Sequence, residues 1–253
     1  MKEFQYNFSD KNHSMYDKDL RLIKANKTLS VLGDYLGELS NLKLLDIGCS
    51  SGIMTYEYAK FFKNVIGIDL DKKAVEFAKK NKQSENIKYF IGPIEESNFD
   101  YETFDVITCS HIYEHVPSSN DLIDEIYNLL KPGGVCYFAA GNRYNLNIME
   151  AHYRLPFLSF LPKKIANIYI GIFRKEKAYY ETHLSLTKLR KLVGRFDIED
   201  YSLKILRQPK KFFATDMLTE NTIKYYAYNL LGRLFYYFFP TYIWILKKAH
   251  HDT

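Results

Sequence analysis

The stretch Leu44–Gly52 reads LLDIGCSSG, and a second stretch, Val65–Asp71, reads VIGIDLD. Each begins with a short apolar run, which predicts a buried strand. The first run stops at Gly48 and Gly52, which lack a Cβ and so allow a sharp turn against which a ligand can lie. The second run ends at an acid, Asp69. A strand, a glycine turn and an acid after the next strand together indicate a ligand site at the edge of a parallel sheet.

Short apolar runs and helical patterns alternate along residues 20–205. Such alternation is typical of a parallel sheet with helices on both faces, which binds ligands beyond the carboxyl ends of its strands. We therefore predict a doubly wound, Rossmann-like α/β fold with a seven-stranded, mainly parallel sheet. The predicted strands are Leu42–Ile47, Asn64–Asp69, Ile87–Ile91, Phe104–Cys109, Val135–Ala140, Phe196–Leu206 and Tyr242–Lys247. The predicted helices are Asp19–Leu39, Ile53–Phe62, Lys72–Asn81, Asn120–Leu130, His183–Gly194 and Met217–Tyr237.

The alternation lapses after the fifth predicted strand and resumes before the C-terminus. A chain that returns in this way can place its last strand antiparallel, between the fifth and the sixth. We expect one domain over residues 1–253. Its parts would be an N-terminal helical segment (1–40), a cofactor-binding core (41–145), a helical cap inserted after strand five (146–182) and the last helices and strands of the sheet (183–253).

The composition excludes several classes of protein. Cys49, Cys109 and Cys136 are an odd number without a C-x-x-C pair, so we expect neither disulfides nor a cysteine zinc site, and a cytoplasmic location. The polar N-terminus is not a secretory signal. The most apolar run, Phe235–Leu246, is shorter than the roughly 20 residues that span a bilayer, and Pro240 interrupts it, so no transmembrane span is expected. The formal net charge of +5 suits an acidic partner or a membrane surface without requiring either.

The glycine turn distinguishes two classes of cofactor. A dinucleotide site follows G-x-G-x-x-G, with a helix N-terminus facing the pyrophosphate. Ser50 stands at the middle glycine position, so this fingerprint is absent. Asp46, just before the turn, would repel a pyrophosphate and attract the cationic amino group of S-adenosylmethionine, which has no phosphate. Asp69 can accept hydrogen bonds from both ribose hydroxyls in either class.

The pair LLDIGCSSG and VIGIDLD resembles motif I and its follow-on acid in the class I S-adenosylmethionine-dependent methyltransferases. The segment IKYFIGPIEESNFDYETFDVITCSHIYEHV (residues 87–116) and the string LLKPGG before strand five resemble the rest of that core, so the resemblance covers residues 40–145. It implies S-adenosylmethionine as the cofactor and methyl transfer as the activity. By this resemblance the cofactor would lie against Asp46, Gly48, Cys49, Gly52, Asp69, Leu70, Ile94, Glu95, Ser110 and His111.

The sequence departs from the family at two positions. Ser50 replaces a usual glycine, which a serine can do if its φ is negative. Pro93 stands where the family often has an aspartate that binds the adenine amino group, and Glu95 is the neighbouring carboxylate that would have to replace it.

The stretch His111–Val116 reads HIYEHV and fits H-x-x-E-H, the signature of a zinc peptidase. That signature requires a helix, so that both histidines share one face, whereas here a predicted strand precedes it and Pro117 follows it. In the ubiquinone-pathway O-methyltransferases a comparable E-x-x-E-H binds a divalent metal, but His111 replaces the first glutamate. We therefore expect no metal.

The same loop would border the methyl acceptor, with Glu114 and His115 at its mouth. His115 is the candidate general base for a hydroxyl, since imidazole side chains titrate near neutral pH. The alternatives are that His115 caps or hydrogen-bonds the following helix, or that it binds substrate or a metal.

The acceptor is expected under residues 142–181 and the N-terminal segment. The run Arg154–Lys175 places aliphatic residues between basic ones, as in helices that lie in a membrane interface. This run indicates either a lipid-linked acceptor with docking at the inner membrane surface, or a cap that packs its apolar face onto the sheet. The aromatic residues Tyr236–Phe239 allow the same two interpretations. Basic and aromatic residues suit an anionic or sugar-like acceptor, and the candidate wall residues are Arg143, Tyr144, His152, Tyr153 and Arg154.

Three classes of function remain open. The first is methyl transfer to a small-molecule, lipid-linked or glycan-type acceptor, with O-methylation favoured. The second is a catalytically degenerate protein that binds the cofactor as a scaffold, and the third is an NAD-dependent oxidoreductase, disfavoured by Ser50 and Asp46. Nucleic acid is an unlikely partner, because the Asp/Asn-Pro-Pro-aromatic string of base methyltransferases is absent from the loop at His111–Val116.

Overall fold

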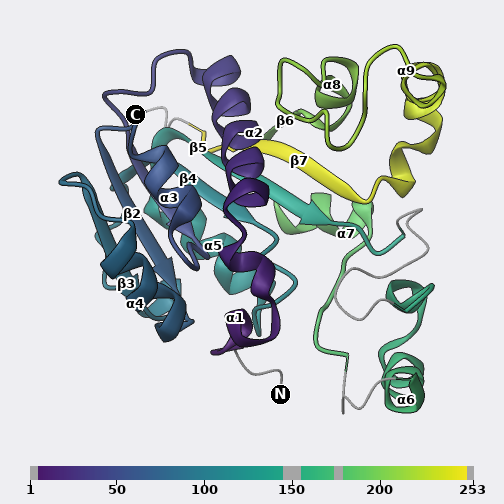
Figure 1. Cartoon of the computed structure of the whole chain (residues 1–253), viewed down its shortest axis with the longest axis horizontal. Helices are drawn as coiled ribbons and strands as arrows, with labels where there is room; N and C mark the ends of the chain where they lie inside the picture. Colours follow the sequence, from purple (N-terminus) through teal and green to yellow (C-terminus); the bar gives the residue numbers. More distant parts are fainter. Residues whose placement is uncertain (1–4, 145–154, 174–178, 250–253) are drawn as a thin grey trace.

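A seven-stranded sheet forms the middle layer of the molecule (Figure 1). The computed structural model describes residues 5–144, 155–173 and 179–249. The strands are β1 (Lys43–Ile47), β2 (Asn64–Asp69), β3 (Ile87–Ile91), β4 (Phe104–Ser110), β5 (Leu130–Gly141), β6 (Asp197–Asp200) and β7 (Thr241–Lys247), in the order β3-β2-β1-β4-β5-β7-β6. Only β7 runs antiparallel to its neighbours, β5 and β6. The predicted mainly parallel sheet, with its last strand antiparallel between the fifth and sixth, is confirmed.

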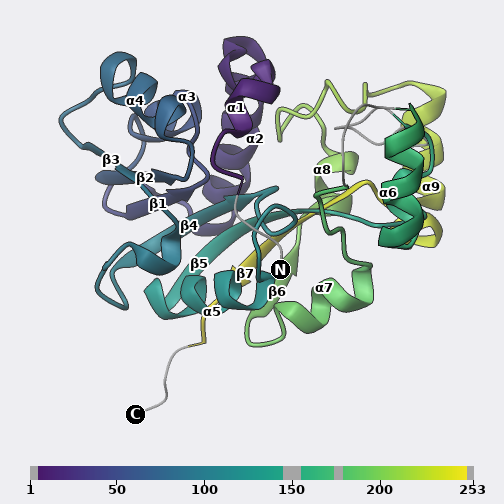
Figure 2. The same ribbon diagram turned by 90° about the horizontal axis from the view of Figure 1, so that it is seen from below.

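Helices cover both faces of this sheet (Figure 2). They are α1 (Phe8–Lys11), α2 (Lys18–Leu36), α3 (Ile53–Tyr58), α4 (Lys72–Asn81), α5 (Ser119–Leu129), α6 (Lys163–Phe173), α7 (Leu186–Leu192), α8 (Ser202–Arg207) and α9 (Ile223–Phe235), with short 3-10 helices η1 (His13–Tyr16), η2 (Ile94–Glu96), η3 (Leu158–Phe160) and η4 (Tyr236–Phe238). On one face, α2, α3 and α8 bury apolar side chains against strand residues such as Leu44 and Ile245. On the other, α5 and α7 pack against residues such as Ile107 and Trp244.

The cap after β5 has a small core of its own. Leu158 of η3 and Ile170 of α6 are buried there together with Leu155 and Tyr179. The expected helical cap is therefore present in residues 155–173. In the described parts of the chain, no helix combines the length and the apolar content needed to cross a membrane.

The predicted strand over Phe196–Leu206 is wrong for its second half. The chain leaves the sheet at Tyr201, because the Asp200 side chain accepts from the Ser202 N–H (2.8 Å) and the Ser202 hydroxyl accepts from the Ile243 N–H (3.0 Å). Helix α8 starts at that point instead. Helix α9 also begins later than predicted, after Thr222, whose hydroxyl accepts from the Tyr225 N–H and caps the helix.

The glycine turn between β1 and α3 has a left-handed backbone at three positions. Gly48 and Gly52 have φ of +77° and +72°, and a Cβ on Gly52 would lie 2.6 Å from the Cβ of Ala78. Ser50 lies between them with φ of +48°, so the expectation of a negative φ at this serine is wrong. The turn imposes this φ because it directs the Ser50 N–H to the Asp69 carboxylate, 2.8 Å away.

We expect Ser50→Gly to raise the free energy of unfolding by up to about 1 kcal/mol. A left-handed residue with a Cβ costs about 1–2 kcal/mol, which exceeds the entropic cost of about 0.5–1 kcal/mol that a glycine adds. Urea denaturation measures the change. Ser51→Gly is the matched control: Ser51 has no positive φ and its hydroxyl donates to the Met15 carbonyl, so this variant should be less stable than wild type. Destabilisation by both changes would contradict the strain at Ser50.

Candidate functional site

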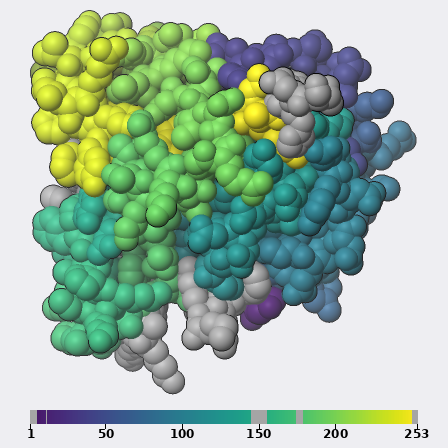
Figure 3. Space-filling view, turned by 180° about the vertical axis from the view of Figure 1, so that it is seen from behind, coloured from purple at the N-terminus to yellow at the C-terminus, as the bar shows by residue number. Residues whose placement is uncertain are grey.

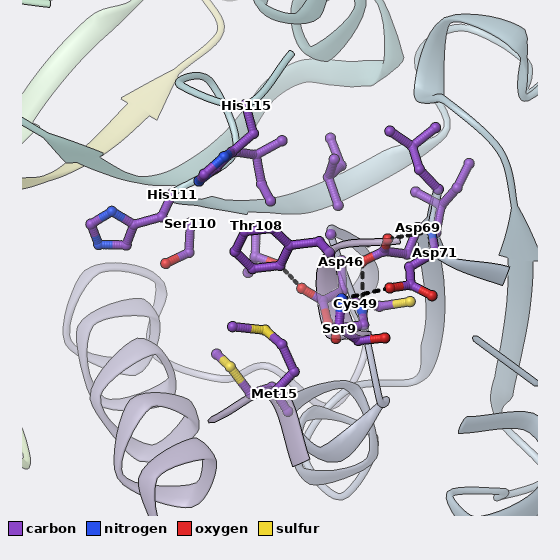
Figure 4. A pocket seen from close by; sticks show the side chains of 18 of the residues that line it. Ser9, Met15, Asp46, Cys49, Asp69, Asp71, Thr108, Ser110, His111 and His115 are labelled. Atoms are coloured by element: carbon purple, nitrogen blue, oxygen red, sulfur yellow. Dashed lines mark hydrogen bonds between the residues drawn. The ribbon is translucent and has the colours of Figure 1, made fainter. Parts of the chain in front are cut away.

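A cavity of about 560 Å³ opens at the carboxyl ends of β1, β2 and β4. Its volume lies within the roughly 300–1,000 Å³ of small-molecule sites. The N-terminal cover, which we define as residues 5–16 with α1 and η1, contributes part of the wall. Figure 4 shows Asp46, Asp69 and Asp71 at one end of this cavity and Ser110, His111 and His115 at the other. The cover contributes Gln5, Phe8, Ser9, Asn12, Ser14 and Met15.

The carboxylate of Asp46 lies buried in the wall of the cavity, at the end of β1. It accepts hydrogen bonds from the hydroxyls of Thr55 (2.6 Å) and Thr108 (2.7 Å), which come from α3 and β4. Burial raises the pKa of Asp46 to about 6, against the lowering effect of these two hydrogen bonds and of the Arg21 charge. A buried acid of this kind is stabilised in its ionised form by a cation placed in the cavity.

Asp69, at the end of β2, holds the glycine turn and the start of the next loop. Its two oxygens accept from the backbone N–H groups of Ser50 (2.8 Å) and Asp71 (2.9 Å). A carboxylate has about four acceptor sites, so two ribose hydroxyls can still donate to it. Burial raises the pKa of Asp69, although both backbone hydrogen bonds lower it.

Asp71 connects this end of the cavity to the N-terminal cover. One oxygen caps α4 by accepting from the Ala74 N–H (3.1 Å), and the other accepts from the Ser9 N–H (2.7 Å) in a buried contact. The Ser51 hydroxyl donates to the Met15 carbonyl and attaches the cover a second time. The cover is therefore attached to the same loops that form the cavity.

Arg21 of α2 also lines the cavity. Its guanidinium contacts the sulfur atoms of Met15 and Met54. Burial lowers the pKa of Arg21, and the charges of Asp46 and Asp69 raise it. The cavity wall thus contains a partly buried cation and a buried carboxylate, an arrangement that suits a zwitterionic ligand.

The loop after β4 is not helical, so the H-x-x-E-H signature has no helix on which both histidines could share a face. His111 has φ of +56°, and its Nδ1 lies 3.0 Å from the Glu114 carboxylate. Burial would raise the pKa of Glu114, but the hydrogen bond from His111 and the charges of His111, His115 and His183 lower it to about 2. Within residues 5–144, 155–173 and 179–249, no three His, Cys, Asp or Glu side chains are arranged to share a metal ion.

His115 lines the cavity. Its Nδ1 lies 3.2 Å from the side-chain amide oxygen of Gln5 and 3.9 Å from the buried carboxylate of Glu181. Its ring centroid lies 5.1 Å from that of Phe8. The Gln5 side-chain oxygen and the Glu181 carboxylate are both acceptors, and they favour the tautomer with the proton on Nδ1. This is the tautomer that a general base needs when a carboxylate lies behind it.

A short segment, residues 179–184, brings Glu181 to this position; we call it the strap. The Thr182 N–H donates to the Glu114 carbonyl (3.0 Å), and the Leu184 N–H donates to the Tyr113 hydroxyl (3.1 Å). The Arg143 N–H in turn donates to the Leu184 carbonyl (3.0 Å). The strap is therefore attached both to the loop after β4 and to the end of β5.

The structure gathers most of the sequence-predicted residues around the cavity. Gly52 is not among the lining residues, because its missing Cβ faces Ala78, and Glu114 is buried behind the loop. The residues that do line the cavity are Asp46, Gly48, Cys49, Asp69, Leu70, Ile94, Glu95, Ser110, His111 and His115.

The expected acceptor wall after β5 differs from the prediction. Arg143 and Tyr144 do not line the cavity: Arg143 reaches the Phe160 carbonyl of the cap (3.5 Å), and Tyr144 stacks on Tyr237. Arg143 therefore contacts the cap, and Tyr144 contacts both the cap, at Phe160, and the C-terminal segment, at Tyr237. The other three candidates, His152, Tyr153 and Arg154, lie outside the described residues.

Sequence reasoning missed Arg21, Ser9 and Glu181. Arg21 stands in a helical pattern beside Leu20 and could have been noticed as a charge near an apolar stripe. Ser9 and Glu181 reach the site through contacts with residues more than 60 positions away, and no local pattern marks them.

The chain matches the family model described as a methyltransferase domain over residues 45–138. It is 31% identical over 174 residues to the ubiquinone biosynthesis O-methyltransferase of Acinetobacter baylyi, and the alignment covers 66% of this chain and 71% of that protein.

Solved structures share the fold at lower identity. A chain from the complex between the Haloferax volcanii Trm112 methyltransferase activator and a methyltransferase superposes with a TM-score of 0.61 at 15% identity, covering 98% of this chain and 99% of that one. An N-methyltransferase of Haemonchus contortus, in complex with phosphomonomethylethanolamine and S-adenosylhomocysteine, superposes with a TM-score of 0.54 at 18% identity, covering 89% of this chain and 53% of that one.

We expect Asp46→Asn to stabilise the ligand-free protein at pH 8. The folded pKa of Asp46, about 6, lies above that of a solvated aspartate, so the stability that this group contributes is full near pH 4 and is lost as the pH rises through 6. The variant removes that loss, and its free energy of unfolding should exceed that of wild type by roughly 1–3 kcal/mol at pH 8 but not at pH 4. Urea titrations at both pH values measure the difference. The exposed Asp19→Asn is the control. An equal effect in Asp19→Asn, or no effect in Asp46→Asn, would contradict the raised pKa of the buried Asp46.

Proposed function

Because the chain belongs to the class I S-adenosylmethionine-dependent methyltransferases, we propose that it uses S-adenosylmethionine to methylate a hydroxyl group of a small-molecule acceptor. The observation that carries this proposal is that the buried Asp46 and the partly buried Arg21, two opposite charges, line one cavity. The methionine end of the cofactor carries an ammonium group and a carboxylate. Asp46 would bind the first and Arg21 the second.

The other cavity residues fit the remaining parts of the same cofactor. Asp69 would accept from the ribose hydroxyls, and Leu70 and Ile94 would lie against the adenine, with Glu95 near its amino group. A dinucleotide fits less well, since Asp46 lies at the start of the turn where a pyrophosphate would be placed and would repel it. We therefore do not favour an oxidoreductase.

The cofactor supplies an activated methyl group, so the chain mainly has to position the acceptor and take up its proton. Ser110, His111 and His115 lie at the end of the cavity away from Asp69; Ser110 and His111 would border the methyl group of the cofactor, and His115 the acceptor. His115 Nε2 would receive the hydroxyl proton, and the Glu181 carboxylate, 3.9 Å from Nδ1, would stabilise the imidazolium that results. Glu181 acts through His115 and is thus a positioning residue.

The likeness to a protein named ubiquinone biosynthesis O-methyltransferase supports oxygen as the acceptor atom. A lipid-linked acceptor agrees with the apolar cap beside this end of the site; a glycan-type acceptor is the alternative. Such an acceptor would place the chain in the cytoplasm, bound peripherally at the inner surface of the membrane. Tritiated-methyl transfer into lipid and aqueous extracts tests the reaction, and tight cofactor binding without any transfer would favour a scaffold protein.

We expect the wild-type chain to bind S-adenosylmethionine in isothermal titration and not NAD. Asp69→Asn and Arg21→Gln should each weaken binding by about 10- to 100-fold, because each removes a charge-assisted hydrogen bond in a buried site. Asp197→Asn, an exposed change on β6, is the matched control and should bind as wild type does. Preferential binding of NAD, or unchanged affinity in both site variants, would contradict the assignment.

We expect His115→Ala to lower kcat by about 10²–10⁴-fold while the affinity for S-adenosylmethionine stays within a few fold, since a general base acts on the acceptor. Glu181→Gln should lower kcat less and move the rising limb of the pH–rate profile to lower pH, because it removes the charge that favours the imidazolium. The exposed His13→Ala is the control. A full kcat in His115→Ala would leave that histidine with a structural role.

A further inference from the structure

Helix α9 exposes a continuous apolar stripe. Ile223, Tyr226, Leu230 and Leu234 are spaced by three or four residues, so they share one face, and between 60% and 90% of each side chain is accessible to solvent. In an ordinary surface helix this stripe would face the core. Here it faces outward.

Helix α6 of the cap also exposes an apolar stripe. Ala166 and Ile170 on its inner side are fully buried, whereas Ile165, Ile168 and Ile172 are between 51% and 70% exposed. The inner side already packs in the core of the cap, so the outer stripe is additional to what folding requires.

The two stripes belong to one region, the α6–α9 surface, which we define as residues 155–173 and 221–240. Both helices lie at the same edge of the molecule, on the right in Figures 1 and 2 and on the left in Figure 3. Aromatic contacts join them: Tyr144 stacks on Tyr237 at 6.0 Å between ring centroids and lies 5.7 Å from Phe160.

The charges of the α6–α9 surface have one sign. It exposes Lys163, Lys164, Lys224 and Arg233, and it contains no aspartate or glutamate, although 30 of the 253 residues of the chain are acidic. A second copy of this surface would bring like charges together. Exposed apolar helices whose own charged residues are all cations are complementary to an anionic lipid bilayer.

We propose that the α6–α9 surface docks on anionic phospholipid, with both apolar stripes inserted at the headgroup level. The cap follows β5 in the sequence, and the cavity opens at the carboxyl ends of the neighbouring strands, so docking would bring the acceptor side of the cavity towards the bilayer. This last step rests on the proposed function. The docking itself does not.

The test is cosedimentation of the purified full chain with vesicles of phosphatidylglycerol and phosphatidylcholine, or of phosphatidylcholine alone. Wild type should bind the anionic vesicles at least about tenfold more tightly, and added salt should weaken binding. The pairs Leu230→Glu with Leu234→Glu, and Ile168→Glu with Ile172→Glu, should each weaken binding at least about tenfold, because they remove inserted apolar area. Lys163→Glu with Lys164→Glu should abolish the preference for anionic lipid.

Tyr101→Glu, at an exposed aromatic residue outside this surface, is the matched control and should bind vesicles as wild type does. Isothermal titration of every variant with S-adenosylmethionine separates the two proposals. A variant that loses vesicle binding but keeps full cofactor affinity is affected only at the surface. A wild-type chain that does not bind the cofactor would contradict the proposed function alone. The docking proposal would be overturned if wild type bound neither vesicle type or bound both equally. It would also be overturned if wild type formed a dimer that the substitutions on the α6–α9 surface abolished.

Discussion

Two backbone N–H groups, those of Ser50 and Asp71, donate to the carboxylate of Asp69, and the shape of the cavity depends on this pair of hydrogen bonds. They hold the glycine turn against the end of β2. Asp71 extends the constraint, because it caps α4 and accepts from Ser9 of the N-terminal cover. The same carboxylates determine the charge of the cavity: burial raises the pKa of Asp46 and Asp69, so their ionised forms are costly without a positive ligand.

The parallel part of the fold follows from local sequence, because each of its strands is a short apolar run ended by a glycine, an acid or a polar loop. The region after β5 does not. Phe196–Leu206 alternates well enough for a strand, yet the chain turns into a helix at Ser202 because that residue is hydrogen-bonded to Ile243, 41 positions later. The positive φ of Ser50 likewise depends on a partner, Asp69, that only the folded chain places beside it.

The site residues likewise fall into two groups, those that local sequence predicts and those that only tertiary contacts bring to the cavity. Asp46 and Asp69 lie at the carboxyl ends of predicted strands and His115 follows another, and the rule that parallel strands present these ends at one edge was sufficient to place them together. Arg21 and Glu181 reach the cavity from a helix and from the strap, through tertiary contacts that no local pattern encodes. Sequence reasoning therefore identified Asp46 and His115 but not their charged partners, Arg21 and Glu181.

The N-terminal cover has a consequence for the rate of the reaction cycle. Its residues line one side of the cavity, so a cofactor that passed between them and the loops would require Ser9 to release Asp71 and Ser51 to release Met15. Hydrogen bonds of this kind contribute on the order of 1 kcal/mol each, which allows the cover to lift on the microsecond-to-millisecond timescale of other lids. Exchange of cofactor by this route would be coupled to the opening of residues 5–16, and the lifetime of their contacts with Asp71 and Ser51 would then limit the rate of that exchange.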